Sequence, residues 1–332
     1  MPPKGFRPPR SVRRVSRRWP RPRTRRRGTG CISSPSTCRA PRCSPATTSS
    51  IWRTSSWPST TGSWIVQGRP AGRKAAVLGS PISHSRSPDL HLAAYRALGL
   101  TDWTYERIEC TAEQLPGLVG GLGPEWVGLS VTMPGKFAAL AVATDRTDRA
   151  ALVGSANTLV RTDGGWRADN TDIDGVVGAL AAHVDRPRRA AVLGSGGTAP
   201  AAVVALATLG VRDIAVVARN PDKAAPLVAL ADPLGVTVHW VHLGTVVDAE
   251  VVVSTLPAGV AAEYASTVAG VPVLLDAIYD PWPTPLAAAV TASGGAVISG
   301  LQMLLNQAFT QVEQFTGLPA PKDVMRRALG GL

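Results

Sequence analysis

The fold of this chain is decided by residues 190–199, which read Ala190-Ala191-Val192-Leu193-Gly194-Ser195-Gly196-Gly197-Thr198-Ala199. Four apolar residues predict a buried strand, and the Ala, Val and Leu residues after the glycine-rich turn predict a helix. Glycines in this G-x-G-x-x-A pattern allow a tight turn and a close approach of the backbone to a pyrophosphate, whose charge the helix N-terminus stabilises. An ordinary strand-to-helix turn is the alternative. The strand before and the helix after favour a dinucleotide site, formed by Gly194, Ser195, Gly196, Gly197, Thr198 and Ala199.

The end of the next predicted strand, residues 213–218, indicates which dinucleotide binds. NAD sites usually carry an acidic residue there, which bonds the ribose 2′-hydroxyl. This chain has Arg219 and Asn220 instead, followed by Lys223. A cation at this place fits the extra phosphate of NADP(H), and a solvated arginine at a strand end is the alternative. Further strands at 251–254 and 273–276 predict a parallel sheet with right-handed crossovers.

Charge is distributed very unevenly along the 332 residues. The first 70 residues contain 16 Lys and Arg and no Asp or Glu, whereas the rest of the chain contains 19 basic and 23 acidic residues, a net charge of −4. The pI of about 10.4 therefore says nothing about the partners of the body. Residues 1–70 are rich in Arg, Pro and Ser without periodicity, and we expect them not to fold. Three explanations are weighed for them: a translated upstream region with a start near Val66, which we favour, a transit peptide, or a nucleic-acid-binding arm.

Cysteine and histidine usage excludes several kinds of site. Cys110 is the only cysteine beyond residue 70, and the five histidines are not spaced as metal ligands. We therefore expect no disulfide framework, no metal and a reduced, cytoplasmic environment. The apolar runs are too short to span a bilayer, so no membrane segment is expected.

Residues 75–171 alternate between strand-like and helix-like segments, which predicts a second α/β unit. Strands are expected at residues 75–78, 104–108, 126–131, 157–161 and 166–168, the last two joined by a hairpin turn at Asp163-Gly164-Gly165. A helix at 173–183 leads to the polar break at 185–189, which is a natural domain junction.

Two serines precede the first helix of this unit, in the block Gly79-Ser80-Pro81-Ile82-Ser83-His84-Ser85-Arg86-Ser87-Pro88. Ser87 is expected at the N-cap and Pro88 at the first helical position, with Gly99 ending the helix. A carboxylate bound there meets the hydroxyls of Ser85 and Ser87 and the free N–H groups of the helix N-terminus. The alternative is a capped helix without a ligand.

Seven blocks occur in the order found in shikimate dehydrogenases, which the chain closely resembles from about residue 73 to its end. They are residues 79–91, 130–136, 154–158, 169–172, the glycine loop, 276–279 and 300–307. The resemblance implies NADPH-dependent reduction of 3-dehydroshikimate to shikimate, a step of aromatic amino-acid biosynthesis. The expected fold is a two-domain α/β architecture. It has a parallel-type substrate-binding catalytic domain, residues 71–171 with 300–332, and a Rossmann-like NADP-binding domain, residues 172–299, which close about a hinge at 186–189.

The resemblance assigns a catalytic pair to Lys136 and Asp172, each of which in isolation reads as a surface charge. Hydride addition to a ketone leaves an alkoxide, so a proton donor must lie within hydrogen-bond reach of that oxygen. Lys136 is the candidate donor, and Asp172 orients it. Substrate-contacting positions are matched by Ser85, Ser87, Thr132, Asn157, Tyr279 and Gln307, together with the catalytic pair. The cofactor positions predicted beyond the glycine loop are Arg219, Asn220, Lys223, Ser254, Thr255, Leu256, Ala277, Gly300 and Met303.

Four positions depart from the family pattern. Asn is common at the positions of Ser130 and Ala218, Asn or Gln at that of Leu92, and an aromatic residue at that of Gly135. Two rival functions are considered. A quinate or shikimate dehydrogenase that uses NAD would favour an acidic residue in place of Arg219. A nucleic-acid-binding protein acting through residues 1–70 would not need an intact catalytic pair. We expect a small-molecule substrate, no nucleic acid, and a monomer or homodimer.

Overall fold

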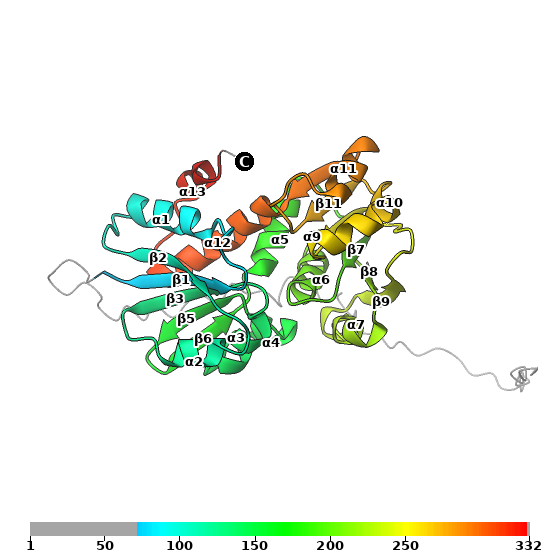
Figure 1. The fold of residues 1–332 in the computed structure, drawn as a ribbon. Coiled ribbons are helices and arrows are strands. Elements are labelled where there is room, and N and C mark those ends of the chain that lie inside the picture. Colours follow the sequence, from blue (N-terminus) through cyan, green and yellow to red (C-terminus); the bar gives the residue numbers. More distant parts are fainter. Residues whose placement is uncertain (1–71, 331–332) are drawn as a thin grey trace, which may run out of the picture. The chain divides into compact units, whose positions relative to one another are not determined.

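The computed structural model describes residues 72–330, and these residues build two separate six-stranded sheets (Figure 1). The expectations for residues 1–70 lie outside this range. Among the helices of residues 72–330, none combines the length and the hydropathy needed to cross a bilayer. The same residues contain no group of three or more His, Cys, Asp or Glu side chains suited to a metal ion.

The first sheet is mixed, with strand order β2-β1-β3-β5-β6-β4. Its strands are β1 Lys74–Gly79, β2 Thr104–Glu109, β3 Trp126–Val131, β4 Asp145–Arg146, β5 Thr158–Thr162 and β6 Gly165–Asp169. β1 pairs in parallel with β2 and β3, whereas β5 runs antiparallel to both β3 and β6. Thr162 pairs with Gly165 across the turn, which confirms the predicted hairpin, because only antiparallel strands can be joined by so short a connection.

The helices of this half are α1 Ser87–Ala97, α2 Leu115–Gly120, α3 Lys136–Val142 and α4 Asp148–Val153. The prediction that Ser87 is the N-cap is wrong. Arg86 occupies that position, Ser87 is the first helical residue, and no side chain caps the helix. The amide of Ser87 instead lies 3.3 Å from Oγ of Ser85, a local bond that orders the loop just before the helix. Gly99 follows the helix with φ of 73°, as expected for a residue that ends it.

The second sheet is parallel throughout, with strand order β12-β11-β10-β7-β8-β9. Its strands are β7 Arg189–Leu193, β8 Asp213–Ala218, β9 Thr237–His242, β10 Val251–Ser254, β11 Val273–Asp276 and β12 Ala296–Ser299. The chain first moves outward from β7 to β9 and then reverses from β10 to β12. The reversal lies between β7 and β10, where open α/β sheets bind ligands at the carboxyl ends of their strands.

Both faces of the central strands β7, β10 and β11 are buried, which explains their nearly continuous apolar sequences. Val192 packs toward α5 and α6 on one face, and the next residue, Leu193, packs toward α10 and α11 on the other. The helices of this half are α5 Asp172–Leu180, α6 Ala199–Thr208, α7 Pro221–Val228, α8 Ala231–Leu234, α9 Ala258–Ala261, α10 Ala265–Val268 and α11 Pro285–Ala292, with a 3₁₀ turn at Ala262–Tyr264.

Two long-range helix contacts join the two halves of the described chain. α12, Gly300–Thr316, lies beside α5, and α5 also packs on α6 (Figure 1). α13, Lys322–Ala328, packs against α1 near the start of the chain's described part. α12 also packs against α1 of the first half. Leu305 and Phe309 of α12 share an apolar cluster with Leu90 and Ala94 of α1.

Candidate active site

Lys136 and Asp172 form a buried ion pair. Each is the first residue of its helix, α3 and α5, and their side chains meet with Nζ 2.5 Å from Oδ2. The residues are 8% and 5% exposed. Removing two charges from water is costly, so such a pair persists only where its geometry is good and its other atoms are bonded. The structure thus brings together the two residues that the sequence assigned to the catalytic pair.

Asn157 holds the second oxygen of the Asp172 carboxylate. Its Nδ2 donates to Oδ1 of Asp172 at 2.9 Å, and its Oδ1 accepts from the amide of Thr171 at 2.7 Å. Nδ2 also lies 3.3 Å from Oε1 of Gln307, which reaches the site from α12. Asn157 and Gln307, both predicted substrate contacts, therefore lie directly beside the catalytic pair.

A second ion pair supports the loop that carries Asp172. Arg149 donates from Nε and Nη2 to the two oxygens of Asp169, and from Nη1 to Asp174 at 2.8 Å. Burial raises the pKa of Asp169, but the bonds and charge of Arg149 outweigh it and hold that pKa below its usual value. Burial dominates at Asp174 and raises its pKa. The loop between Asp169 and Asp172 is thus fixed at both ends.

A chain of buried hydrogen bonds leads from Tyr105 to Asn157. Tyr105 donates to Oγ of Ser130 at 2.6 Å, and Ser130 donates to Oε1 of Gln311 at 2.8 Å. Gln311 donates from Nε2 to Oγ1 of Thr158 at 2.9 Å and to the carbonyl of Asn157 at 3.2 Å. Ser130 stands where Asn is common in the family pattern, and its hydroxyl both accepts and donates a bond within this chain of hydrogen bonds.

His91 contacts two members of this chain of hydrogen bonds, Gln311 and Tyr105. Its Nε2 lies 3.3 Å from Oε1 of Gln311, and its ring stacks on Tyr105. Complete burial lowers the pKa of His91 to about 3, despite the opposing bond from Gln311. The imidazole is therefore neutral at physiological pH, and we infer a structural role for it.

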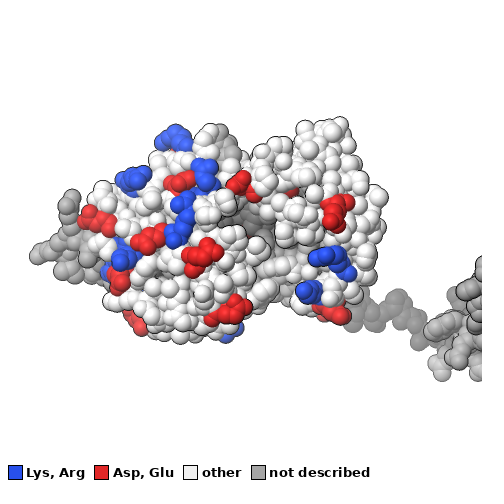
Figure 2. Space-filling model, in the orientation of Figure 1, with Lys and Arg blue, Asp and Glu red and all other residues white. Residues whose placement is uncertain are grey.

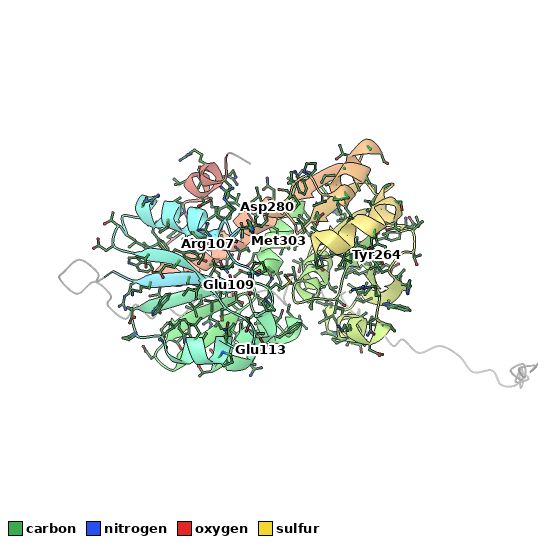
Figure 3. All side chains as sticks on the ribbon, viewed as in Figure 1. Arg107, Glu109, Glu113, Tyr264, Asp280 and Met303 are labelled. Atoms are coloured by element: carbon green, nitrogen blue, oxygen red, sulfur yellow. The ribbon has the colours of Figure 1, made fainter. Side chains whose placement is uncertain are left out.

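The serine loop is clamped by two charged residues at the end of β2. Nε of Arg107 donates to the carbonyl of Ser85 at 2.8 Å, and the Glu109 carboxylate accepts from Oγ of Ser80 at 2.6 Å and from the amide of Ile82 at 3.2 Å. Figure 3 shows Arg107 and Glu109 at the edge of the first sheet that faces the second half. Both predicted carboxylate-binding serines, Ser85 and Ser87, are buried against this clamp.

The loop after β11 reaches the serine loop from the second half. Oδ2 of Asp280 lies 3.4 Å from Nδ1 of His84. Burial raises the pKa of Tyr279, although bonding to the backbone of Arg86 opposes this shift. Tyr279, a predicted substrate contact, is therefore brought to the same loop as Ser85 and Ser87.

The departure at Gly135 has a steric cause. A Cβ built at this residue would lie 2.9 Å from side-chain carbons of both Leu115 and Val131. A larger residue here would require these two side chains to move. Phe137, two residues later, is instead 55% exposed, beside the glycine loop.

The glycine loop has the geometry that a pyrophosphate requires. Gly194 has φ of 105°, which side chains rarely adopt, and a Cβ there would lie 2.7 Å from Oγ1 of Thr255. A Cβ at Gly196 would meet nothing within 4 Å, so the backbone is open to a ligand on that side. Ala199 begins the buried helix α6, whose N-terminus adjoins the loop. These features fit NADP(H).

The predicted 2′-phosphate residues lie exposed at the end of β8. Within residues 72–330, neither Arg219 nor Lys223 forms an ion pair. Asn220 caps α7, because its Oδ1 accepts a hydrogen bond from the amide of Asp222. Figure 2 shows Lys and Arg side chains gathered near the position of α7. An exposed guanidinium and an exposed ammonium suit a phosphate dianion.

The remaining predicted cofactor residues contribute backbone and shape more than polar side chains. Ser254 is fully buried, Thr255 donates to the carbonyl of Leu193 at 2.9 Å, and Leu256 lies in the core. A Cβ at Gly300 would lie 2.1 Å from the carbonyl oxygen of Ala277, so only glycine allows α12 to start there. Met303, one turn further along, is buried against α5. Thr132 is half-buried, with its amide bonded to Leu78.

Sequence reasoning missed several residues that support the site: Tyr105, Arg107, Glu109, Arg149, Ser155, Asn170 and Gln311. One signal was present, because Gln311 follows Gln307 by four residues and so lies on the same face of α12. Ser155 and Asn170 lie within the family blocks 154–158 and 169–172, although no role was assigned to them. The other four contact the site only through tertiary structure.

Comparison with known families identifies both ends of the described region. The family model for the shikimate dehydrogenase substrate binding domain matches residues 77–159, and the model for the shikimate 5′-dehydrogenase C-terminal domain matches residues 300–329. A shikimate dehydrogenase (NADP(+)) from Microcystis aeruginosa is 36% identical over 272 residues, which cover 76% of this chain and 94% of the relative.

Solved structures give the same result. Shikimate dehydrogenase from Mycobacterium tuberculosis superposes with a TM-score of 0.74 at 72% identity, covering 78% of this chain and 100% of that one. Shikimate 5-dehydrogenase from Thermus thermophilus, crystallised with NADP(H) and shikimate, gives a TM-score of 0.67 at 30% identity, over 77% and 98% of the two chains.

Proposed function

Because the chain belongs to the shikimate dehydrogenase family, we propose that it catalyses the reversible NADPH-dependent reduction of 3-dehydroshikimate to shikimate. The observation that carries the proposal is the buried Lys136–Asp172 pair, which lies beside the glycine loop. The contact with this loop supports a role for Lys136 as a proton donor close to the bound dinucleotide. The product belongs to the shikimate pathway of aromatic amino-acid biosynthesis.

Lys136 is the proton donor of the proposed reaction. NADPH, when bound, supplies the hydride that reaches the ketone carbon. The ammonium of Lys136 stabilises the negative charge that develops on the ketone oxygen and donates the proton that completes the hydroxyl. In the direction of oxidation the neutral amine takes this proton back. Asp172 orients Lys136, and Asn157 fixes Asp172 from its other oxygen.

The substrate end of the site is formed by the serine loop and its neighbours. Ser85 and Ser87 bind the carboxylate of the substrate, and the N-terminus of α1 stabilises its charge. Thr132, Tyr279 and Gln307 bind the hydroxyl groups, together with Asn157 and the catalytic pair. Bonds from Arg107 and Glu109 to the loop support this role, because they keep the hydroxyls in one geometry before substrate arrives.

The cofactor end is formed by the second half of the chain. Residues 194–199 bind the pyrophosphate, and Arg219 binds the 2′-phosphate with Asn220 and Lys223 beside it. Residues 254–256, Ala277, Gly300 and Met303 surround the nicotinamide. The positive φ of Gly194 and the open space at Gly196 support the first assignment.

The domain division proposed for this function follows the two sheets. Residues 71–171 with 300–332 form the substrate domain, and residues 172–299 form the cofactor domain. The packing of α5 on both α12 and α6 supports a boundary at α5. The net charge of −4 beyond residue 70 leaves this part of the chain without the excess of positive charge that nucleic-acid binding requires, which supports a small-molecule enzyme.

A spectrophotometric assay tests the proposal. NADP should be reduced in the presence of shikimate, with a kcat/KM that exceeds the values for NAD and for quinate. Faster turnover of quinate with NAD would make the protein a quinate dehydrogenase. If no NADP is reduced in the presence of shikimate at any pH between roughly 7 and 10, the proposed activity is overturned.

A further inference from the structure

The ammonium of Lys136 has a second partner besides Asp172. Its Nζ donates to Oγ1 of Thr198, a residue of the glycine loop, at 2.8 Å. Thr198 occupies the N-cap of α6, where a threonine hydroxyl ordinarily accepts a bond from an amide of the first helical turn. Here the side chain makes no capping bond. Its hydroxyl is directed to the lysine instead.

The glycine loop is held against Lys136 by a separate set of bonds. Oγ of Ser155 donates to the carbonyl of Gly197 at 2.9 Å, and Nδ2 of Asn170 donates to the carbonyl of Ser155 at 2.9 Å. A Cβ built at Gly197 would lie 3.3 Å from Cβ of Lys136, which is tighter than ordinary contact. Glycine at this position therefore lets the loop approach the stem of the lysine.

We propose that Thr198 is a positioning residue for the proton donor, and that the dinucleotide loop thereby sets the orientation of Lys136. This role rests on the proposed function. A lysine ammonium has three N–H donors. Asp172 and Thr198 each accept one, which leaves a single N–H for the reacting oxygen of the substrate.

The need for two partners follows from the flexibility of the side chain. Lysine has a long stem with several rotatable bonds, and one bond to Asp172 would leave the ammonium free to turn about it. A second bond, from a different element, removes that rotation. Because small misplacements of a reacting group cost large factors in rate, the loss of this bond should be seen in kcat.

Thr198→Val removes the hydroxyl and keeps the shape of the side chain. A hydrogen bond to a charged group corresponds to about a 10- to 100-fold change, so kcat for shikimate oxidation should fall by that factor. The KM for shikimate and the dissociation constant of NADPH, measured by fluorescence titration without turnover, should change by no more than about threefold. Thr198→Ser keeps the hydroxyl and should retain most of the rate.

Thr208→Val is the matched control. Thr208 lies at the other end of α6 and bonds only to the carbonyl of Val204, so this variant should show wild-type kcat and NADPH affinity. Ser155→Ala removes a bond that holds the glycine loop but leaves both partners of Lys136 in place. It should lower kcat by a smaller factor than Thr198→Val does. Thermal melting of each variant reports whether it folds.

The outcomes are distinguishable. An active wild type with an unimpaired Thr198→Val overturns the positioning role alone. A loss of NADPH affinity with kcat unchanged would show that Thr198 serves only the cofactor, and it would also overturn the positioning role. If Thr198→Val fails to fold, a wild-type kcat for Ser155→Ala overturns the role. An inactive wild type overturns the proposed function, and this role with it.

Discussion

Nζ of Lys136 lies 2.5 Å from Oδ2 of Asp172, although 36 residues separate them in the chain. The contact forms because α3 and α5 both begin where strands of the first sheet end, β3 and β6. Lys136, the proposed proton donor, is largely buried, so only a small part of its side chain can contact a substrate. The predictions below follow from this pair and its neighbours.

Lys136→Ala should lower kcat by about 100-fold or more with little change in KM, since general acid catalysis contributes factors of this size. Steady-state kinetics with shikimate and NADP measure both constants. Lys322→Ala is the control, because Lys322 is exposed on α13 and its ammonium lies over the ring of Phe309. A rise in KM with kcat intact would make Lys136 a binding residue.

Replacing Ser85 and Ser87 together by Ala should raise the KM for shikimate by roughly 10-fold or more, because two hydrogen bonds to a carboxylate are lost. The KM for NADP should hardly change. Initial rates at varied shikimate and at varied NADP separate the two effects. Equal increases in both KM values would return the serine loop to a structural role.

Gln311→Met should lower stability by about 1–3 kcal/mol, because buried donors and acceptors on Ser130, Thr158 and Asn157 lose their partner. It should also lower kcat, since Asn157 fixes Asp172. Urea denaturation and kinetics measure the two effects. Gln302→Met, on the same helix but outside these bonds, is the control. Wild-type values for Gln311→Met would show that the chain of bonds does not order the site.

Arg219→Ala should weaken NADPH binding by roughly 10-fold or more while leaving NADH binding nearly unchanged, because only NADPH carries the 2′-phosphate. Fluorescence titration with each dinucleotide gives the two dissociation constants. The difference should shrink at high salt, since Arg219 is exposed. Equal losses for both dinucleotides would contradict a phosphate-specific contact.

Arg149→Met should destabilise the fold by about 3–5 kcal/mol at pH 7, because it leaves the buried carboxylate of Asp169 unpaired. The folded pKa of Asp169 is lowered, so its contribution is present above the unfolded pKa and is lost as pH falls through the folded value. The folded pKa of Asp174 is raised, so its contribution to stability falls as the pH rises, opposite to that of Asp169.

The difference in stability between wild type and Arg149→Met should therefore narrow as pH falls below about 4, where carboxylates begin to protonate. Urea denaturation across this range measures it. Arg326→Met removes an exposed pair with Asp323 and should change little at any pH. A difference that does not depend on pH would assign the effect to packing of the Arg149 side chain.

Much of the fold was predictable because it depends on local pattern. The strands predicted at 126–131, 213–218, 251–254 and 273–276 match β3, β8, β10 and β11, since buried strands read as short apolar runs between turn residues. Errors occurred at helix ends. The helix expected at 173–183 ends at Leu180, and Ser87 is a helical residue and not a cap, because terminal geometry depends on bonds outside the helix.

The candidate site was predictable only in part. The glycine loop and the serine loop carry their chemistry in consecutive residues, so sequence alone locates them. Support from Arg107, Arg149 and Gln311 involves partners from other elements, such as the carbonyl of Ser85, Asp169 and Asn157. No local pattern encodes such bonds, because they form only after the strands and helices have packed.

The sequence by itself determined the two α/β units, the dinucleotide loop and the residue types available for catalysis, since each of these rests on short-range periodicity and turn chemistry. Only the tertiary structure decided that Lys136 is bonded to both Asp172 and Thr198. The physical reason is that the direction of an ammonium is set by the acceptors around it. Those acceptors come from α5 and the start of α6, which are brought together by the packing of whole helices.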